Sequence, residues 1–155
     1  MTESQNTNDR DQRKIVAFRL GKEEYGVDIM AVREIRSWTA TTALPKAPHY
    51  VRGVINLRGA VLPIVDLGLR LGMLGTDDKP SNVIIVIESQ ARLIGLLVDA
   101  VSDILTVGKD KFLPTPSIPS ATVQQFIECV ASIDDRMIQL VASDQILEHQ
   151  IESAA

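Results

Sequence analysis

The chain has 155 residues, enough for one compact domain, and its 45% hydrophobic and 23% charged residues are an ordinary balance for a globular protein. Its net charge of −4 gives no general attraction to nucleic acid or to an anionic membrane surface. The longest apolar stretch, residues 93–98, is too short to cross a membrane, and the polar N-terminal segment lacks the apolar run of a signal peptide. A single cysteine, Cys129, excludes an internal disulfide framework. These features predict a cytoplasmic protein with no nucleic-acid partner and no direct membrane insertion.

After a polar tail over residues 1–12, which we expect to be disordered, short segments rich in valine, isoleucine and leucine predict a series of strands. Their expected ranges are 14–20, 24–28, 50–56, 60–66, 82–88, 92–99, 126–132 and 136–142. Turns at 21–24, 56–59 and 89–92 join neighbouring strands into hairpins, and Gly59 can supply a positive φ. Pro63 has no amide hydrogen, so its strand is expected at a sheet edge or at a bulge.

Short helices are expected between and after these strands. The first covers 28–34, where apolar residues have a roughly helical spacing, and the second follows Asp66, a suitable N-cap. The last covers about 144–152. Many short strands with few helical residues favour paired small barrels over a layered α/β fold.

The same pattern occurs twice in the chain. The matched pairs, in chain order, are 15–26 with 84–95, 32–35 with 101–104, 50–54 with 126–130 and 61–65 with 137–141. We therefore expect one domain over 13–147, with lobes of approximately 14–75 and 82–147, followed by a helix end and tail at 148–155. A seam between two such lobes is a usual place for a binding site.

Catalytic and metal-binding patterns are absent from the sequence. His49, His149 and Cys129 would need distant carboxylates to complete a zinc site. The glycines of 53–59 lack the lysine of a phosphate cradle, and no serine, cysteine or threonine lies in a nucleophile-elbow motif. Cys129 lies in an apolar strand, at the position that Gly53 has in the first copy, which indicates a small buried side chain. We expect neither an enzyme nor a bound cofactor or metal.

Polar residues stand inside two otherwise apolar segments. Glu34 and Arg36 flank Ile35, and Asn56 and Arg58 flank Leu57. For any one of them, simple alternation onto the solvent-facing side of a strand is a sufficient explanation. Arg58 is the exception, because an arginine at a tight hairpin tip beside apolar neighbours has the composition of a binding hot spot.

These residues resemble the motifs of the CheW chemotaxis adaptor family. The resemblance is carried by Phe18–Ile29, Val32–Arg36, Gly53–Gly59 and Pro63–Leu67, continues through 95–103 and 135–138, and covers roughly residues 13–147. It implies an all-β fold with a few short helices, in which two five-stranded SH3-like β-barrels pack on a hydrophobic seam. It also implies a non-enzymatic adaptor that joins the cytoplasmic tips of chemoreceptor helical hairpins to the regulatory domain of the CheA histidine kinase, with further CheW copies as possible neighbours in array rings.

The resemblance also assigns residues to partners. Positions linked to receptor binding in the family match Val32, Glu34, Gly53 and Arg58, and Ile29 and Asn56 lie in the same motifs. Positions that face the kinase or a neighbouring adaptor match Val101, Leu113, Pro114, Pro116 and Ile118. The chain departs from the family pattern at Gly68, Cys129, Ala142 and Ser143, and the last three bear on partner choice in the second lobe.

Two other functions stay open at this point. A small-ligand-binding barrel would need a cavity with converging polar groups, and the apolar strands show none. The adaptor could also serve a non-flagellar chemosensory pathway, such as pilus motility. The sequence does not distinguish between these pathways or identify the receptors.

Overall fold

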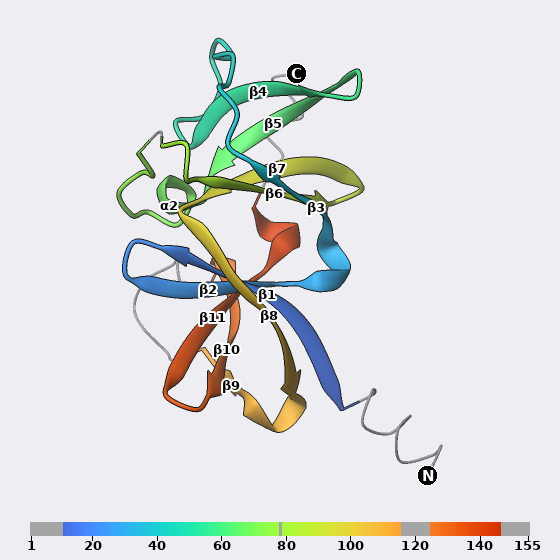
Figure 1. Cartoon of the computed structure of the whole chain (residues 1–155), viewed down its shortest axis with the longest axis vertical. Helices are drawn as coiled ribbons and strands as arrows, with labels where there is room; N and C mark the ends of the chain where they lie inside the picture. Colours follow the sequence, from blue (N-terminus) through green and yellow to red (C-terminus); the bar gives the residue numbers. More distant parts are fainter. Residues whose placement is uncertain (1–10, 78, 116–124, 147–155) are drawn as a thin grey trace.

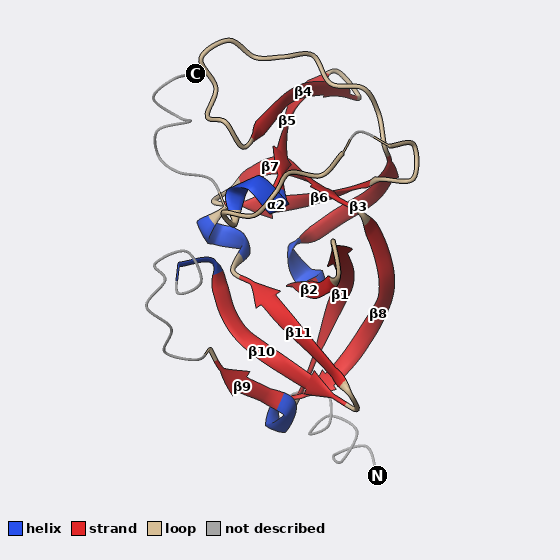
Figure 2. Ribbon diagram, turned by 90° about the vertical axis from the view of Figure 1, so that its left-hand side faces the viewer, coloured by secondary structure: helices blue, strands red, loops and turns tan. Residues whose placement is uncertain are grey.

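Two β-sheets, one above the other, make up most of the computed structural model, which describes residues 11–77, 79–115 and 125–146 (Figure 1). The lower, six-stranded sheet has the order β8-β1-β2-β11-β10-β9, with β1 Gln12–Leu20, β2 Glu23–Asp28, β8 Ala100–Gly108, β9 Phe112–Pro114, β10 Ile127–Ile133 and β11 Arg136–Val141. The upper, five-stranded sheet has the order β3-β6-β7-β5-β4, with β3 Val32–Ser37, β4 Val51–Leu57, β5 Ala60–Asp66, β6 Val83–Ser89 and β7 Arg92–Val98. Short helical segments connect them, namely η1 Ile29–Ala31, α2 Leu67–Arg70, η2 Lys109–Lys111 and η3 Ser143–Gln145 (Figure 2).

The two sheets do not coincide with the two sequence copies. Hairpin β1–β2 belongs to the first copy but lies in the sheet of β8 to β11, and hairpin β6–β7 of the second copy lies between β3 and β5. The expected lobes of 14–75 and 82–147 are therefore not the spatial units, because each copy gives its first hairpin to the other lobe. No local sequence pattern reports such an exchange.

Equivalent glycines allow the exchanged hairpins to dock. Strand β2 runs parallel to β11 with Gly26 opposite Leu140, and β7 runs parallel to β5 with Gly95 opposite Ile64. A Cβ on Gly95 would lie 2.6 Å from Ile64 Cδ1, and one on Gly26 would lie 3.1 Å from Ile138 Cγ2. Side chains at these positions would crowd the isoleucine side chains that pack over the two glycines, which gives a physical reason for glycine in both copies.

The largest apolar cluster lies on the seam and combines residues from both sheets. Its buried members include Val16, Phe18, Tyr25 and Val27 from the lower sheet and Val65, Ile85, Ile87 and Leu96 from the upper sheet. Smaller clusters fill each lobe, around Ile55, Leu62, Ile84 and Val86 in the upper one and around Ile15, Ala17, Ile138 and Leu140 in the lower one. The expected fold, two barrel-like lobes on a hydrophobic seam, is confirmed.

All eight predicted strands are present, but three further strands were not predicted. They are β3, β8 and the short edge strand β9. The predicted helix at 28–34 was wrong, because Asp28 caps a single 3₁₀ turn and the chain then continues as β3, paired with β6. The alternating exposure of β3 places Glu34 and Arg36 on one face and Ile35 on the other.

The remaining local predictions have mixed outcomes. A helix does follow Asp66, whose carboxylate accepts a hydrogen bond from the Leu69 amide at 3.2 Å. The predicted helix at 144–152 begins with the 3₁₀ turn η3, and its residues beyond 146 lie outside the described chain. Of the predicted disordered tail, residues 1–10 also lie outside it, and the strand β1 starts at Gln12.

Of the two settings predicted for Pro63, an edge or a bulge, the edge is wrong, because β5 lies inside the sheet. The β4–β5 pairing does have a bulge, which lies on β4 between Val51 and Gly53. Strand β5 lies between β4 and β7, but its pairing with β7 starts only at Ile64. On the side that faces β4, the residue opposite Pro63 is Val54. The backbone amide and carbonyl of Val54 hydrogen-bond to Thr42, at 2.8 and 2.9 Å, and not to Pro63. The missing amide hydrogen of Pro63 therefore costs no ladder bond.

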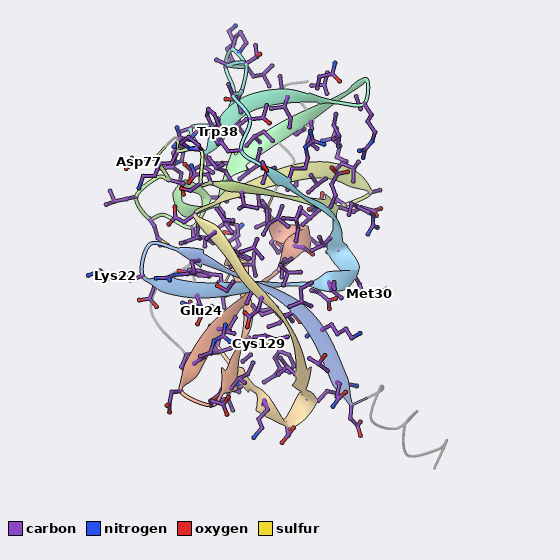
Figure 3. The ribbon with its side chains drawn as sticks, viewed as in Figure 1. Lys22, Glu24, Met30, Trp38, Asp77 and Cys129 are labelled. Carbon is purple, nitrogen blue, oxygen red and sulfur yellow. The ribbon has the colours of Figure 1, made fainter. Side chains whose placement is uncertain are left out.

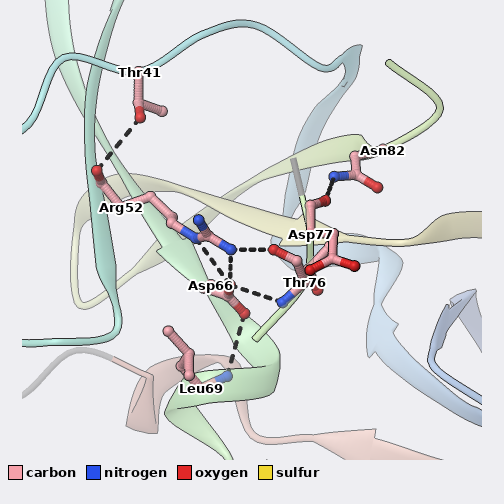
Figure 4. Close-up of polar contacts among 7 residues, drawn as sticks. All are labelled: Thr41, Arg52, Asp66, Leu69, Thr76, Asp77 and Asn82. Atoms are coloured by element: carbon pink, nitrogen blue, oxygen red, sulfur yellow. Dashed lines mark hydrogen bonds and ion pairs between the residues drawn. The ribbon is translucent and has the colours of Figure 1, made fainter. Parts of the chain in front are cut away.

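A buried carboxylate fixes the loop that follows α2. Asp66 is fully buried and accepts hydrogen bonds from Arg52 Nε at 3.0 Å and from the Thr76 amide at 3.0 Å, in addition to capping α2 (Figure 4). Arg52 also donates to the Thr76 carbonyl. Buried charges are normally paired and hydrogen-bonded, and Asp66 meets this condition. Its carboxylate also connects β4, α2 and the loop before β6.

Candidate functional site

An ion-pair cluster joins two edges of the upper sheet at the predicted site. Arg58 Nη2 donates to Glu34 Oε2 at 2.5 Å, and Arg36 Nη1 donates to Glu34 Oε1 at 3.0 Å. Glu34 and Arg36 are on β3, whereas Arg58 is in the turn between β4 and β5. The structure therefore brings Glu34 and Arg58, two of the predicted site residues, into direct contact.

The turn that carries Arg58 has a strained but well-supported backbone. Arg58 and Gly59 both have positive φ, 50° and 87°, as a two-residue type I′ hairpin turn requires. The side-chain oxygen of Asn56 accepts a hydrogen bond from the Gly59 amide at 2.8 Å. Asn56 therefore supports the turn, while Arg58, with 72% of its side chain exposed, is its solvent-facing residue.

Two guanidinium groups hold Glu34 in its ionised form. The hydrogen bond from Arg58 and the one from Arg36 both lower the pKa of the Glu34 carboxyl below its ordinary value. The side chain of Glu34 is 26% exposed, so the cluster is at the surface but not freely solvated. It is an ionised, oriented group at neutral pH.

The other predicted receptor-side residues lie in different surroundings. Ile29 and Val32 are partly buried and pack against the seam cluster. Gly53 is buried with φ of 146°, and a Cβ on it would lie 2.3 Å from the Thr42 carbonyl oxygen. Any side chain there would displace the segment that closes the upper lobe, so glycine at position 53 is required for the backbone shape.

A shallow cleft lies along the lower sheet, between β1, β8 and the turn η1. It has a volume of about 400 Å³ and is lined by Gln12, Arg13, Lys14, Asp28, Ile29, Met30 and Thr106. Met30, the middle residue of η1, is 79% exposed, and Figure 3 shows it beside the seam. Met30 was not among the residues that the sequence singled out, because a single methionine in an apolar segment gives no signal of exposure.

The predicted kinase-side residues do not form one cluster. Val101 is half-buried at the start of β8 and packs against the same seam cluster as Ile29 and Val32. Leu113 and Pro114 are exposed on β9, beyond the far end of β8, so roughly 23 Å of strand separates Val101 from that end. Pro116 and Ile118 lie outside the described residues.

The lower sheet also has an ion-pair cluster, which includes the repeat counterpart of Glu34. Arg136, at the start of β11, donates from Nη2 to Glu24 at 2.5 Å and to Asp103 at 3.0 Å. Asp103 follows Glu34 by one repeat length, and hairpin β10–β11 corresponds to β4–β5. The hydrogen bond from Arg136 lowers the pKa of Glu24. Each lobe thus has a carboxylate on one strand paired with an arginine from its hairpin.

The described residues hold no group of three or more histidine, cysteine or acidic side chains that could bind a metal. Cys129 is half-buried on β10 and packs against the lower-lobe cluster, and burial raises the pKa of its thiol (Figure 3). No helix in the described ranges is long and apolar enough to span a membrane.

Comparison with known proteins agrees with the fold. The CheW-like domain family matches residues 14–150. The chain is 52% identical to the chemotaxis protein CheW of Rhizobium meliloti over 92% of both chains, and 32% identical to that of Klebsiella aerogenes over 88% of this chain and 82% of the relative. The crystal structure of the scaffolding protein TtCheW from Thermoanaerobacter tengcongensis has a TM-score of 0.82 at 33% identity and covers 88% of this chain and 92% of that one. The chain therefore belongs to the CheW family and is a non-enzymatic scaffold protein of chemotaxis.

Proposed function

We propose that this protein couples the cytoplasmic tips of chemoreceptor helical hairpins to the regulatory domain of a CheA histidine kinase. Its membership of the CheW family and its similarity to a scaffolding protein support this role. In that role it is cytoplasmic, held at the inner face of the membrane by the receptors. Neighbouring CheW copies are further candidate partners in a ring.

The exposed, oriented guanidinium of Arg58 is the observation that carries the receptor half of the proposal. Glu34 fixes the position of Arg58, while most of the arginine side chain remains accessible. The tip of a helical hairpin offers carboxylates and backbone carbonyls, which a planar guanidinium binds with several hydrogen bonds at once. Ile29 and Val32 would supply apolar contact at the seam, and Asn56 and Gly53 would support the backbone.

The kinase half of the proposal rests on strand β9, at the end of the molecule opposite Arg58. Leu113 is 45% exposed and Pro114 is also exposed, on a three-residue strand at the edge of the lower sheet. A short edge strand with exposed apolar side chains is suited to packing against another β-rich domain. Pro116 and Ile118 extend this proposed surface along the sequence, and Val101 is proposed as an additional contact nearer the seam.

Simultaneous binding of both partners tests whether the two proposed surfaces are separate. Separate surfaces predict that a purified chemoreceptor cytoplasmic fragment and the isolated kinase regulatory domain bind one molecule of this protein together. Analytical ultracentrifugation should then show a three-component complex. Leu113→Asp should weaken the kinase domain's binding and leave the receptor fragment bound. Mutually exclusive binding of the two partners would overturn the proposal.

A further inference from the structure

Glu34 contacts a different arginine through each of its two carboxylate oxygens. Oε2 accepts from Arg58 at 2.5 Å, and Oε1 accepts from Arg36 at 3.0 Å. A carboxylate with one partner can still rotate about its last bond, because that torsion is soft. A second partner on the other oxygen removes this freedom, so Arg36 determines which way Oε2 faces.

The two arginines differ in how firmly they are placed. Arg36 is two residues after Glu34 on β3, so both side chains project from the same face of one strand. Strand β3 is itself paired to β6, with Arg36 opposite Ile84. Arg58 instead reaches Glu34 from a turn, and its side chain is 72% exposed against 33% for Arg36. Arg36 is therefore the fixed partner and Arg58 the accessible one.

Folding alone does not explain an arginine at position 36. Its Nε is buried and has no hydrogen-bond partner among the described residues. An unsatisfied buried donor is unfavourable, and a glutamine or methionine of similar length would not bury this donor. Arg36 thus stands at a position where its own hydrogen bonding is incomplete, and among the described residues its guanidinium donates to Glu34.

We propose that Arg36 is a positioning residue for receptor binding, acting on Arg58 through Glu34. The inference rests on the proposed function, because it assumes that Arg58 contacts the receptor. With Arg36 present, Glu34 presents one oxygen toward the hairpin turn, and Arg58 is held ready to bind. Without Arg36, the carboxylate rotates more freely, and the receptor must order Arg58 on binding.

A double-mutant cycle on receptor affinity tests this chain of contacts. Isothermal titration calorimetry with a purified chemoreceptor cytoplasmic fragment would compare Arg36→Gln, Glu34→Gln and the double variant with the unchanged protein. Arg36→Gln should weaken binding roughly three- to tenfold, a coupling in the lower range for contacting residues. In the Glu34→Gln background the same change should cause no further loss. Arg36→Lys should restore part of the affinity.

The control is Arg33→Gln, which removes a charge from the same strand. Arg33 pairs with Glu88 rather than with Glu34, so its loss should leave affinity nearly unchanged. A carboxyl-carbon NMR titration should show a higher Glu34 pKa in Arg36→Gln, which tests whether the two side chains interact in solution. If Arg36→Gln weakened receptor binding equally with and without Glu34→Gln, or did not weaken it at all, the proposed role of Arg36 would be wrong. The proposed function would not be affected by either result. An unchanged affinity in Arg58→Ala would overturn the proposed function as well.

Discussion

Glu34 and Arg58 come from opposite edges of the five-stranded sheet, yet their side chains meet at 2.5 Å. Strands β3 and β4 are the first and last in the sheet order, so this contact requires the sheet to curl into a barrel. The isolated bridge between Thr42 and Val54 closes the same lobe through the backbone. The ion pair therefore lies where the barrel closes and also orients the residue proposed to bind the receptor.

Removing the charge of Glu34 should separate the two binding activities. Glu34→Gln keeps the size of the side chain but takes away the anion that orients Arg58. We expect weaker binding to a receptor fragment and unchanged binding to the kinase regulatory domain, measured by biolayer interferometry with each partner alone. A parallel loss of both activities in a folded variant would mean that the two surfaces are not independent.

The ionisation of Glu34 should depend on Arg58. Because the Arg58 and Arg36 hydrogen bonds lower the pKa of Glu34, the pair contributes stability above the ordinary glutamate pKa and loses it as the pH falls through the lowered value. Arg58→Ala should raise the pKa of Glu34 toward its ordinary value, as followed by carboxyl-carbon NMR. An unaltered titration curve would show that the two side chains do not interact in solution.

Cys129 should react slowly with a thiol reagent in the native protein. It is half-buried, and burial raises its pKa, so less of the reactive thiolate is present at neutral pH. Labelling with 5,5′-dithiobis(2-nitrobenzoate) should become fast in guanidinium chloride. Equally fast labelling without denaturant would contradict the placement of this residue against the lower-lobe cluster.

Asp66 should be among the most sensitive positions for stability. Asp66→Ala removes the cap of α2, releases the Thr76 amide and leaves the partly exposed Arg52 without its carboxylate. The loss should be about 3 kcal/mol, the lower end for breaking a buried charge pair. Urea denaturation followed by circular dichroism would measure it, with Asp99→Ala as the control because Asp99 is only partly buried and accepts a single exposed bond from Gly21.

The repeat in the sequence predicted the hairpins because each one is local. Alternating apolar residues and turn residues are enough to define β1–β2 or β6–β7, and both are where the pattern placed them. The exchange of these hairpins between lobes depends on contacts such as Gly26 with Leu140, far apart in the chain. Strand β3 was read as a helix because its apolar spacing fits both structures, and long-range pairing with β6 determined which one forms.

The sequence predicts individual residues of the candidate site but not the contacts between them. Glu34 and Arg58 were both singled out, and their contact depends on the curl of the sheet, which no short motif encodes. Arg36 was noticed only as a polar neighbour. Had β3 been recognised as a strand, the two-residue spacing of Glu34 and Arg36 would have placed them on one face.

The most direct test of the coupling role is to measure how well the Arg58→Ala variant supports receptor-dependent activation of the kinase. Losing the hydrogen bonds of a charged donor should cost ~1.5–3 kcal/mol of receptor affinity, or roughly ten- to a hundredfold. Tm should stay nearly fixed, since Arg58 is exposed at a turn, and Arg58→Lys should recover only part because an ammonium lacks the planar fork. In an assay with receptor fragment and kinase, we predict a strong loss of activation by Arg58→Ala at unchanged Tm. Normal activation by a stable Arg58→Ala protein would contradict the account.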